Sequence, residues 1–343
     1  MINKYLVSPE KNVKEVISYM EENYLKAVIV AEENRVLRGL FTLGDMRHYF
    51  LNGGSLASNI TEAMNSHPIT FQSLREAENY KKELTIYPIL NSAGVVTNVL
   101  GAENQSNIIT DSLKNVPVVI MAGGKGTRLY PYTKILPKAL IPIGDYTITE
   151  RIIHLFHNYG CIEFYMILKH KAGMIKSYFN EIEKDYTLHF EEEQEFLGTG
   201  GGLSCLKNQV NDTFFLSNCD VLIDADLECI YQTHKKEKNK ITFVCAMKDV
   251  VIPYGIIETN SYGQIIKMQE KPEFSFLTNT GLYVVEPEVI DDLAPNEFIH
   301  LPDIAQRYLD KGENIGVFPI SEKSWMDMGQ FNEMESMKKR LGV

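Results

Sequence analysis

The most informative pattern in this chain is Val116-Pro-Val-Val-Ile-Met-Ala-Gly-Gly-Lys-Gly-Thr-Arg-Leu129. Its first part, Val116 to Met121, is apolar and predicts a buried strand. Gly123, Gly124 and Gly126 follow at once. Because glycine permits positive φ angles, these residues can turn several backbone N–H groups toward a polyphosphate. The pattern therefore predicts a strand that ends in a phosphate-binding loop, although glycines at such a junction can also serve only a tight turn.

Two cations follow the glycines, Arg128 and Lys138, and both can donate hydrogen bonds to the same anion. A dinucleotide fingerprint would need glycine at Leu129, and a Walker loop would need Ser or Thr after a Gly-Lys pair, so neither motif fits. The pattern resembles the sugar nucleotidyltransferases, whose signature is G-G-x-G-T-R-L followed by P-K. That resemblance implies catalytic roles for Arg128 and Lys138. It also implies nucleotide contacts from Ala122, Gly123, Gly124, Gly126 and Thr127.

Downstream residues alternate between helix and strand patterns. Thr147-Ile-Thr-Glu150 forms a capping box at the start of a predicted helix, Ile148 to Tyr159, and Phe164 to Leu168 predicts a buried strand. Strand, helix and strand in this order indicate a right-handed crossover and a mostly parallel sheet. We therefore expect an α/β domain with a Rossmann-like, mixed but mostly parallel sheet, and ligands at the carboxyl ends of its strands.

A second glycine cluster, Leu197-Gly-Thr-Gly-Gly-Gly-Leu203, follows an acidic stretch. The resemblance implies that Gly198 and Thr199 contact the base and sugar of the nucleotide. A flexible loop before a helix near Leu203 is the other interpretation. Guanine offers two neighbouring donors that suit a carboxylate, so Glu195 or a nearby acidic residue would favour guanine, unless these glutamates are simply solvated.

Two aspartates match the metal ligands of the same family. Asp220 ends the apolar run from Phe214, although Cys219 stands where the family usually has glycine. Asp327 lies in Trp325-Met-Asp-Met-Gly329, which fits the family pattern W-x-D-x-G. The resemblance implies that the two carboxylates bind Mg²⁺, which prefers a few oxygen ligands completed by water and phosphates. Either aspartate alone would suit a turn or a helix cap.

Between these aspartates lie further matches to the family's sugar-phosphate pocket. The resemblance assigns Lys271 to the sugar phosphate, as a further catalytic residue, and Glu270 and Asn279 to the sugar hydroxyls. The substrate-binding residues expected from it are Tyr254, Gly255, Glu270, Lys271 and Asn279. Glu270-Lys271-Pro272 by itself is also a common surface turn.

Before about residue 112, the sequence contains an internal repeat. Ala27 to Val30 and Tyr87 to Leu90 predict strands, each followed by a polar turn and a second apolar segment, and each preceded by a predicted helix, the second at Leu74 to Leu84. This resembles a tandem pair of cystathionine-beta-synthase (CBS) domains, a Bateman module that often senses adenine nucleotides. We expect domains at 1–112 and 116–343, separated by the polar segment 106–115.

The ligand signature of CBS domains, G-x-x-T-x-x-D, occurs once, with Thr42 and Asp45 as its polar residues. In the second half the equivalent positions are Asn98, Gly101 and Asn104, so at most one competent adenine nucleotide site is expected. A hydroxyl at a helix start can bind phosphate, and a carboxylate one turn later can accept from ribose. The same two residues also suit a capping box.

Bulk properties exclude several classes of function. The formal charge of -11 argues against nucleic-acid and anionic-membrane partners, which require a basic surface. Five cysteines without a C-x-x-C pair, no signal-peptide pattern and no apolar run of bilayer length favour a cytoplasmic protein. CBS pairs often associate, so we also expect a homo-oligomer.

Together these patterns predict a Mg²⁺-dependent enzyme that joins a nucleoside triphosphate to a sugar 1-phosphate. GTP and glucosamine 1-phosphate are favoured, with mannose 1-phosphate next, because the combination resembles bacterial GDP-sugar enzymes of surface glycans, including those of the legionaminic acid route to flagellin glycosylation. Thymidylyl or uridylyl transfer is the alternative within the fold. A nucleotide-sensing regulator without catalysis is the alternative outside it.

Overall fold

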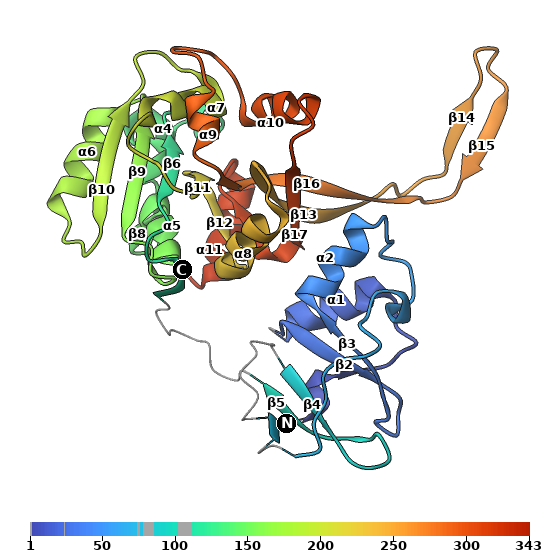
Figure 1. Cartoon of the computed structure of the whole chain (residues 1–343). Coiled ribbons are helices and arrows are strands. Elements are labelled where there is room, and N and C mark those ends of the chain that lie inside the picture. Colours follow the sequence, from blue (N-terminus) through green and yellow to red (C-terminus); the bar gives the residue numbers. More distant parts are fainter. Residues whose placement is uncertain (1, 24, 74–75, 78–85, 102–110) are drawn as a thin grey trace. The chain divides into compact units, whose positions relative to one another are not determined.

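The computed structural model describes residues 2–23, 25–73, 76–77, 86–101 and 111–343. The chain divides into two compact units, Met1–Ser106 (unit 1) and Asn107–Val343 (unit 2) (Figure 1). Residues 106–115 were expected to separate the domains, and residues 106–110 of that segment lie outside the described part. Each unit is considered by itself below. In the described residues no helix is both long and apolar enough to cross a bilayer.

The described part of unit 1 contains five short strands. Its first three strands form one sheet in the order β1-β2-β3, with β1 parallel to β2 and β2 antiparallel to β3. The last two strands form a separate hairpin. The elements are η1 (Ile2–Tyr5), β1 (Leu6–Val7), α1 (Val13–Glu22), β2 (Ala27–Ala31), β3 (Leu37–Thr42), α2 (Leu43–Leu51), η2 (Ile60–Glu62), β4 (Ile86–Leu90) and β5 (Val96–Gly101).

The two hairpins of unit 1 repeat one another residue by residue. Ala27 pairs with Thr42 in the first hairpin and Ile86 pairs with Gly101 in the second, and both ladders shift register near the end of their first strand. A bridge between Val36 and Val95 joins equivalent positions of the two halves. The predicted repeat of strand, turn and strand is therefore confirmed. The helix expected at Leu74 to Leu84 lies mostly outside the described residues, and the assignment to CBS domains stays a prediction.

Unit 2 contains a seven-stranded mixed sheet in the order β10-β9-β6-β11-β16-β13-β17. Strands β10, β9, β6 and β11 are mutually parallel, β16 is antiparallel to its neighbours, and β17 is parallel to β13. The predicted α/β fold with a mostly parallel mixed sheet is thus confirmed. The sheet strands are β6 (Val118–Ala122), β9 (Glu163–Leu168), β10 (Thr187–Glu192), β11 (Phe214–Asn218), β13 (Ile241–Val251), β16 (Glu273–Val285) and β17 (Ile315–Ser321).

Helices cover both faces of this sheet because its central strands are apolar on both faces. In β6, Val118 and Ile120 pack with α5, α6, α8 and α11, whereas Val119 packs with η6, α9 and α10. This alternation follows the two-residue period of a strand. The helices are α4 (Tyr132–Ile135), α5 (Ile148–His157), α6 (Ala172–Glu181), α7 (Gly198–Gly201), α8 (Leu227–Glu237), α9 (Glu288–Asp291), α10 (Leu301–Asp310) and α11 (Phe331–Leu341), with 3-10 turns η3 (Asp111–Leu113), η4 (Thr127–Leu129), η5 (Lys138–Leu140), η6 (Gly202–Leu206) and η7 (Glu322–Ser324).

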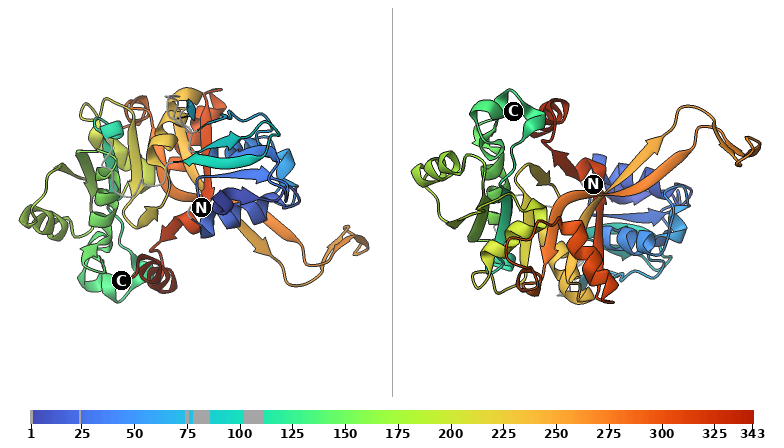
Figure 2. Two further views of the ribbon diagram at one scale, coloured as in Figure 1. Left: turned by 90° about the horizontal axis from the view of Figure 1, so that it is seen from below. Right: turned by 90° about the horizontal axis from the view of Figure 1, so that it is seen from above.

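Three small strand pairs lie outside the main sheet. Strand β12 (Val221–Ile223) pairs with β18 (Trp325–Asp327), and β7 (Pro142–Ile143) pairs with β8 (Tyr146–Thr147). The third pair is a hairpin of β14 (Ile256–Thr259) and β15 (Ile265–Gln269), which projects away from the rest of unit 2 in every view (Figures 1 and 2). We call residues 252–272, the hairpin and its two connections to β13 and β16, the arm.

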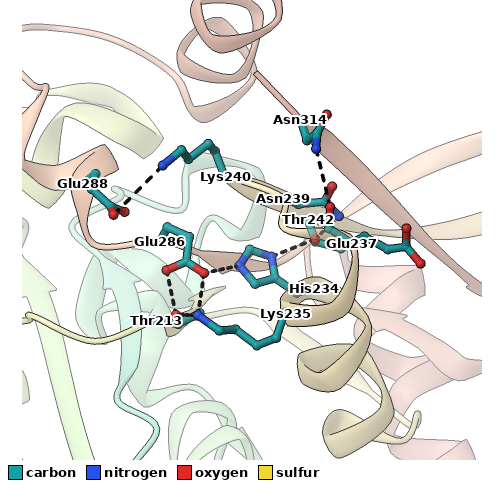
Figure 3. Close-up of polar contacts among 10 residues, drawn as sticks. All are labelled: Thr213, His234, Lys235, Glu237, Asn239, Lys240, Thr242, Glu286, Glu288 and Asn314. Atoms are coloured by element: carbon teal, nitrogen blue, oxygen red, sulfur yellow. Dashed lines mark hydrogen bonds and ion pairs between the residues drawn. The ribbon is translucent and has the colours of Figure 1, made fainter. Parts of the chain in front are cut away.

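A buried polar network joins α8 to the sheet at the end where β11 begins (Figure 3). His234 is fully buried, with Nδ1 2.8 Å from the Thr242 hydroxyl and Nε2 3.1 Å from the Glu286 carboxylate. Lys235 and Thr213 donate to the same carboxylate at 2.8 and 2.7 Å. Every charge in this network has a partner, so we assign it a structural role.

Candidate active site

The glycine loop lies where the sequence predicts it, directly after β6. Ala122 is the last residue of that strand, and Gly123 and Gly124 lead into η4. Gly126 has φ 63°, and a Cβ there would lie 2.9 Å from the Thr133 side chain and 3.1 Å from Lys138 Cβ. Glycine is therefore required at this position both by the backbone angle and by the space. Arg128 is exposed in η4, beside the loop.

Asp220 is brought to this loop by the strand pairing. Strand β11 runs parallel to β6, with Asn218 opposite Met121, and the backbone N–H of Cys219 donates to the Met121 carbonyl at 3.2 Å. The segments that follow the two strands consequently start at the same edge of the sheet. There the Lys138 ammonium forms an ion pair with the Asp220 carboxylate, and both side chains are mostly buried.

Asp327 joins the same group through the β12–β18 pair. Val221, the residue after Asp220, is opposite Asp327, and the Met328 N–H donates to the Asp220 carbonyl at 2.9 Å. The sequence separation of the aspartates, 327 − 220 = 107 residues, is thus closed by one antiparallel ladder. The structure brings the two predicted metal ligands together beside the glycine loop. We call Asp220 and Asp327 the carboxylate pair.

The surroundings of Asp327 are short of positive charge. Its Oδ1 is buried and has no hydrogen-bond partner among the described residues. Burial, followed by the negative charges of Asp220 and Glu333, raises the pKa of Asp327 to about 6, and only Lys138 acts against this rise among nearby charges. An unpartnered carboxylate oxygen beside a second carboxylate is the kind of oxygen donor set that suits Mg²⁺, so the residues present fit that cation.

Glu333 is a third carboxylate near the pair that the sequence patterns did not identify. A Cβ on Gly329 would lie 3.1 Å from Asp327 Oδ2 and 3.3 Å from Glu333 Oε2, so one glycine separates the two side chains. Glu333 Oε2 is buried and also lacks a partner in the described part of the chain. In the sequence, Glu333 shows only the pattern of an acidic residue in the first turn of a helix, which stabilises many helices and does not by itself indicate a site.

The second glycine cluster packs against another backbone segment. Gly198 has φ 82°, and the N–H groups of Gly200 and Gly201 both donate to the Ile299 carbonyl at 3.0 Å. The Thr199 hydroxyl accepts from the Leu301 N–H at 3.3 Å. Glycine at these positions therefore allows close packing against the backbone near Ile299, which the sequence patterns did not predict. The nucleotide contacts expected of Gly198 and Thr199 stay predictions.

Glu193, and not Glu195, occupies the buried acidic position between the two glycine clusters. Glu195 is exposed, whereas Glu193 is 3% exposed and its Oε2 has no partner within the described residues. A Cβ on Gly123 would lie 2.7 Å from Glu193 Oε2, and a Cβ on Gly202 would lie 2.5 Å from its Oε1. Burial is the main cause that raises the pKa of Glu193. The sequence alone could not distinguish Glu193 from its acidic neighbours, because a sequence does not show which of these glutamates is buried.

The residues expected to bind the sugar are divided between two places. Asn279 lies in β16, three residues before Leu282, which pairs with Ser217 of β11; its side chain donates to the Tyr283 hydroxyl at 2.9 Å. The other four are in the arm, where Glu270 lies against Gly255. Tyr254, Gly255, Glu270 and Lys271 are all exposed. The structure thus groups these four with one another at the two connections of the arm, whose strands β14 and β15 project away from the sheet (Figure 1).

In unit 1, Thr42 and Asp45 form a complete capping box at the start of α2. The Asp45 N–H donates to Thr42 Oγ1 at 3.2 Å, and the Thr42 N–H donates to Asp45 Oδ2 at 2.9 Å. The two side chains are also hydrogen-bonded to each other at 2.6 Å. Their ligand role stays a prediction. Of the equivalent positions in the second half, Asn98 and Gly101 lie opposite Ile89 and Ile86, and Asn104 is outside the described residues.

Comparison with known proteins supports the interpretation of unit 2. The model of the nucleotidyl transferase family matches residues 117–341, which include the glycine loop and the carboxylate pair. The chain belongs to this family. The match covers more than half of the chain and leaves unit 1 outside it.

Relatives of this nucleotidyl transferase carry several different names. The chain is 30% identical over 233 residues to a UTP--glucose-1-phosphate uridylyltransferase of Synechocystis sp., covering 62% of this chain and 60% of the relative. It is 33% identical over 222 residues to the bifunctional protein GlmU of Methanococcus aeolicus, with 62% and 51% covered. A mannose-1-phosphate guanyltransferase of Pichia angusta is 29% identical over 225 residues, with 62% and 60% covered. The matched part therefore spans between half and two thirds of each relative.

Solved structures show the same fold. HddC from Yersinia pseudotuberculosis superposes with a TM-score of 0.52 at 21% identity, covering 66% of this chain and 99% of HddC. HddC has also been solved in complex with GMP-PN. At this identity the likeness shows only that the nucleotidyl transferase shares its fold with HddC.

Proposed function

We propose that this chain transfers a nucleotidyl group from a nucleoside triphosphate to a sugar 1-phosphate and releases pyrophosphate. The observation that carries the proposal is that the pairing of β12 with β18 brings Asp220, the residue before β12, together with Asp327 beside the glycine loop and Lys138. Membership of the nucleotidyl transferase family supports it, as do relatives whose names state uridylyl or guanyl transfer to hexose 1-phosphates.

The chemistry requires positioning of the reactants and charge neutralisation more than a protein nucleophile. An oxygen of the sugar phosphate attacks the α-phosphorus of the nucleotide, a new P–O bond forms, and the bond to the β-phosphate oxygen breaks. The backbone N–H groups of the loop at Gly123 and Gly124 hold the triphosphate, and Arg128 balances the charge of the leaving pyrophosphate. Lys138, already at the carboxylate pair, meets the reacting phosphates.

A divalent cation completes the proposed site. Asp220 and Asp327 would hold Mg²⁺, with Lys138 released from Asp220 toward the phosphates. Bound there, the cation supplies additional positive charge against the reacting phosphates. The unpartnered Oδ1 of Asp327 supports this assignment.

Guanine is the base that the buried acidic position favours. Guanine presents N1–H and an exocyclic amine side by side, and a carboxylate can accept from both. We therefore move the base contact from Glu195 to Glu193, whose Oε2 is buried under the glycine loop without a partner in the described residues. Uracil and thymine present one donor between two carbonyls, so they satisfy this carboxylate less well. Uridylyl or thymidylyl transfer is the second candidate, supported by the name of the Synechocystis relative.

Glucosamine 1-phosphate is the favoured acceptor, because the chain resembles GDP-sugar enzymes. Mannose 1-phosphate is next, in line with the name of the Pichia relative.

The decisive experiment incubates the full chain with Mg²⁺, each of four nucleoside triphosphates and a panel of sugar 1-phosphates, and measures pyrophosphate. Release with GTP and one hexose 1-phosphate is expected. Release only with UTP or dTTP would overturn the guanine assignment, and no release with any pair would favour a nucleotide-binding regulator.

For unit 1 we propose one adenine nucleotide site at Thr42 and Asp45, in a CBS-type module. The support is the match to the family's ligand pattern and the internal repeat. A ligand would have to compete with the hydrogen bond that joins the two side chains. Calorimetry of the full chain with AMP, ADP and ATP tests the site, with Asp45→Ala as the matched variant.

A further inference from the structure

The turn that joins β9 to α6, residues 169–171, contacts two segments of the candidate active site. The backbone N–H of His170 donates to the Gly123 carbonyl at 3.3 Å. The Lys169 ammonium donates to the carbonyl of Gln194, in the segment after β10. The glycine loop and the segment that contains the buried acidic position are therefore both attached to this β9–α6 turn.

Lys171, the last residue of the turn, holds the C-terminal end of α4 with one ammonium group. Its Nζ lies 2.9 Å from the Thr133 carbonyl oxygen, 2.7 Å from that of Lys134 and 2.9 Å from that of Ile135. An ammonium has three protons, so these three bonds use all of them. A helix of four residues cannot bond its last carbonyls internally and is too short to be stable alone. Lys171 supplies the bonds that α4 cannot make for itself.

The same helix is attached to the glycine loop. Thr133 is 6% exposed, and its hydroxyl donates to the Gly126 carbonyl at 3.0 Å. Its methyl group fills the space beside Gly126, since a Cβ on that glycine would lie 2.9 Å from it. A displacement of α4 would therefore also displace Gly126.

These bonds determine where the N–H groups of the loop point. In a planar trans peptide, the C=O and the N–H of the next residue point in opposite directions. The Gly123 carbonyl points to the β9–α6 turn, so the Gly124 N–H points away from that turn. The Gly126 carbonyl points to α4, so the Thr127 N–H points away from α4. Two donors expected to hold the triphosphate are thus oriented before a ligand binds.

We propose that Lys171 is a positioning residue of the phosphate loop, which acts through α4 and Thr133 on the Gly126–Thr127 peptide. The inference rests on the proposed function, since it takes the glycine loop as the triphosphate site. Loss of the ammonium should weaken binding of the polyphosphate. It should not change binding of the sugar 1-phosphate, whose expected contacts lie in the arm and in β16.

Lys171→Met tests this by separating the two KM values. The variant keeps an unbranched apolar side chain and removes the ammonium. Pyrophosphate release by the full chain is measured at saturating Mg²⁺, with the substrate pair on which wild type is active. The KM for the nucleoside triphosphate should rise by about 10-fold, the effect of losing a hydrogen bond to a charged group. The KM for the sugar 1-phosphate should stay unchanged. A lower kcat with both KM values unchanged would show only a loss of folded enzyme, and would overturn the inference.

Lys184 supplies the matched control, just beyond the other end of α6. Its ammonium donates to the Phe179 carbonyl at 2.7 Å, in the last turn of that helix. Lys184→Met therefore also removes a bond between a lysine and a helix carbonyl, and both KM values should equal those of wild type. A similar rise in the nucleotide KM would show that any loosening of α6 has this effect, which contradicts a specific role of Lys171.

Thr133 provides a second test, independent of whether the Lys171 variant folds. Thr133→Val keeps the shape of the side chain but removes the hydroxyl that bonds the Gly126 carbonyl, so the nucleotide KM should rise as it does in Lys171→Met. Thr133→Ser keeps the hydroxyl and should return the KM close to the wild-type value. Equal nucleotide KM values in the two variants would show that this hydroxyl does not position the loop.

Calorimetry with magnesium pyrophosphate distinguishes this inference from the proposed function. Wild type should bind it, and Lys171→Met should bind it about 10-fold more weakly. A wild type that binds pyrophosphate but turns over no substrate pair would overturn the proposed function, and the comparison with Lys171→Met would still decide the inference. Equal affinities would overturn the inference alone. A wild type that does not bind pyrophosphate would also overturn it, because the loop would then be no phosphate site.

Discussion

The backbone N–H of Met328 donates to the carbonyl of Asp220 at 2.9 Å, and this bond extends the β12–β18 ladder by one residue, so that Asp220 lies beside the end of the strand that contains Asp327. Asp220 lies between β11 and β12, and Asp327 is the last residue of β18. The relationship is therefore created by the small β12–β18 pair, which the sequence patterns did not predict.

Replacing Asp327 by Asn should abolish most activity. The substitution keeps the size of the side chain but removes the charge that a cation requires, so we expect kcat to fall by a factor of about 100 to 1,000, or about 2.7 to 4 kcal/mol in the barrier. Pyrophosphate release at saturating Mg²⁺ measures this. Asp212→Asn, at an exposed position before β11, is the control and should retain wild-type kcat.

Glu193→Gln should change the choice of base. The amide cannot accept two hydrogen bonds through equivalent oxygens, so kcat/KM for GTP should fall by about 100-fold while values for UTP change little. Comparison with Glu195→Gln separates the two glutamates, since Glu195 is exposed and its variant should behave as wild type. An equal loss with all four nucleotides would show that Glu193 only supports the loop at Gly123.

Gly201→Ala should destabilise the fold. A Cβ at this position would lie 2.1 Å from the Glu297 carbonyl oxygen, which is backbone and cannot rotate away. We expect a loss of about 1 to 3 kcal/mol in the free energy of unfolding, measured with urea. Gly173→Ala is the matched control: nothing lies within 4 Å of its added Cβ, and it sits in helix α6, so this variant should be equal to wild type or slightly more stable.

Stability should decrease in acid partly through Glu286. Burial alone would raise its pKa, but hydrogen bonds from His234, Lys235 and Thr213 outweigh burial and lower the pKa to about 2, against an ordinary value of 4.5. The charged form therefore stabilises the fold above pH 4.5, and this contribution disappears as the pH falls from 4.5 to about 2. Glu286→Gln should be about 2 to 3 kcal/mol less stable near pH 7. That difference should shrink over the same pH range in denaturant titrations.

Thr42→Ala should weaken the start of α2. Loss of the hydroxyl removes one acceptor of the capping box, which costs about 1 kcal/mol. Thermal unfolding of the full chain measures this loss, and Thr42→Ser, which keeps the hydroxyl, should restore most of the lost stability.

Asp45→Ala tests the adenine nucleotide site. If an adenine nucleotide raises the melting temperature of wild type, Asp45→Ala should remove that rise. A rise that survives Asp45→Ala would place the nucleotide elsewhere.

Local patterns predicted local structure well. The strand before the glycine loop, the helix that begins after Thr147 and the repeated hairpins of unit 1 all follow from apolar periodicity and capping residues, and the structure contains each of them. Their boundaries differ by only a few residues. These features depend on neighbours in the sequence, so the sequence alone contains the necessary information.

What the sequence could not predict depends on contacts between distant segments. The burial of Glu193 requires both Gly123 and Gly202, which lie 70 and 9 residues away (193 − 123 and 202 − 193). The closeness of Glu333 to Asp327 depends on how α11 follows β18. The residues Glu270-Lys271-Pro272 could not predict that the arm projects from unit 2, because the same turn sequence suits a segment that covers a site and one that projects into solvent.

The pairing of β12 with β18 also affects how function returns after denaturation. The chain between Asp220 and Asp327 contains β13, β16 and β17, so the ladder that joins the two aspartates closes a long loop, which is entropically costly before those strands have formed. Refolding from urea should recover far-ultraviolet circular dichroism before it recovers the capacity to bind Mn²⁺, and a chain cut before Trp325 should fold much of its sheet yet never acquire that capacity.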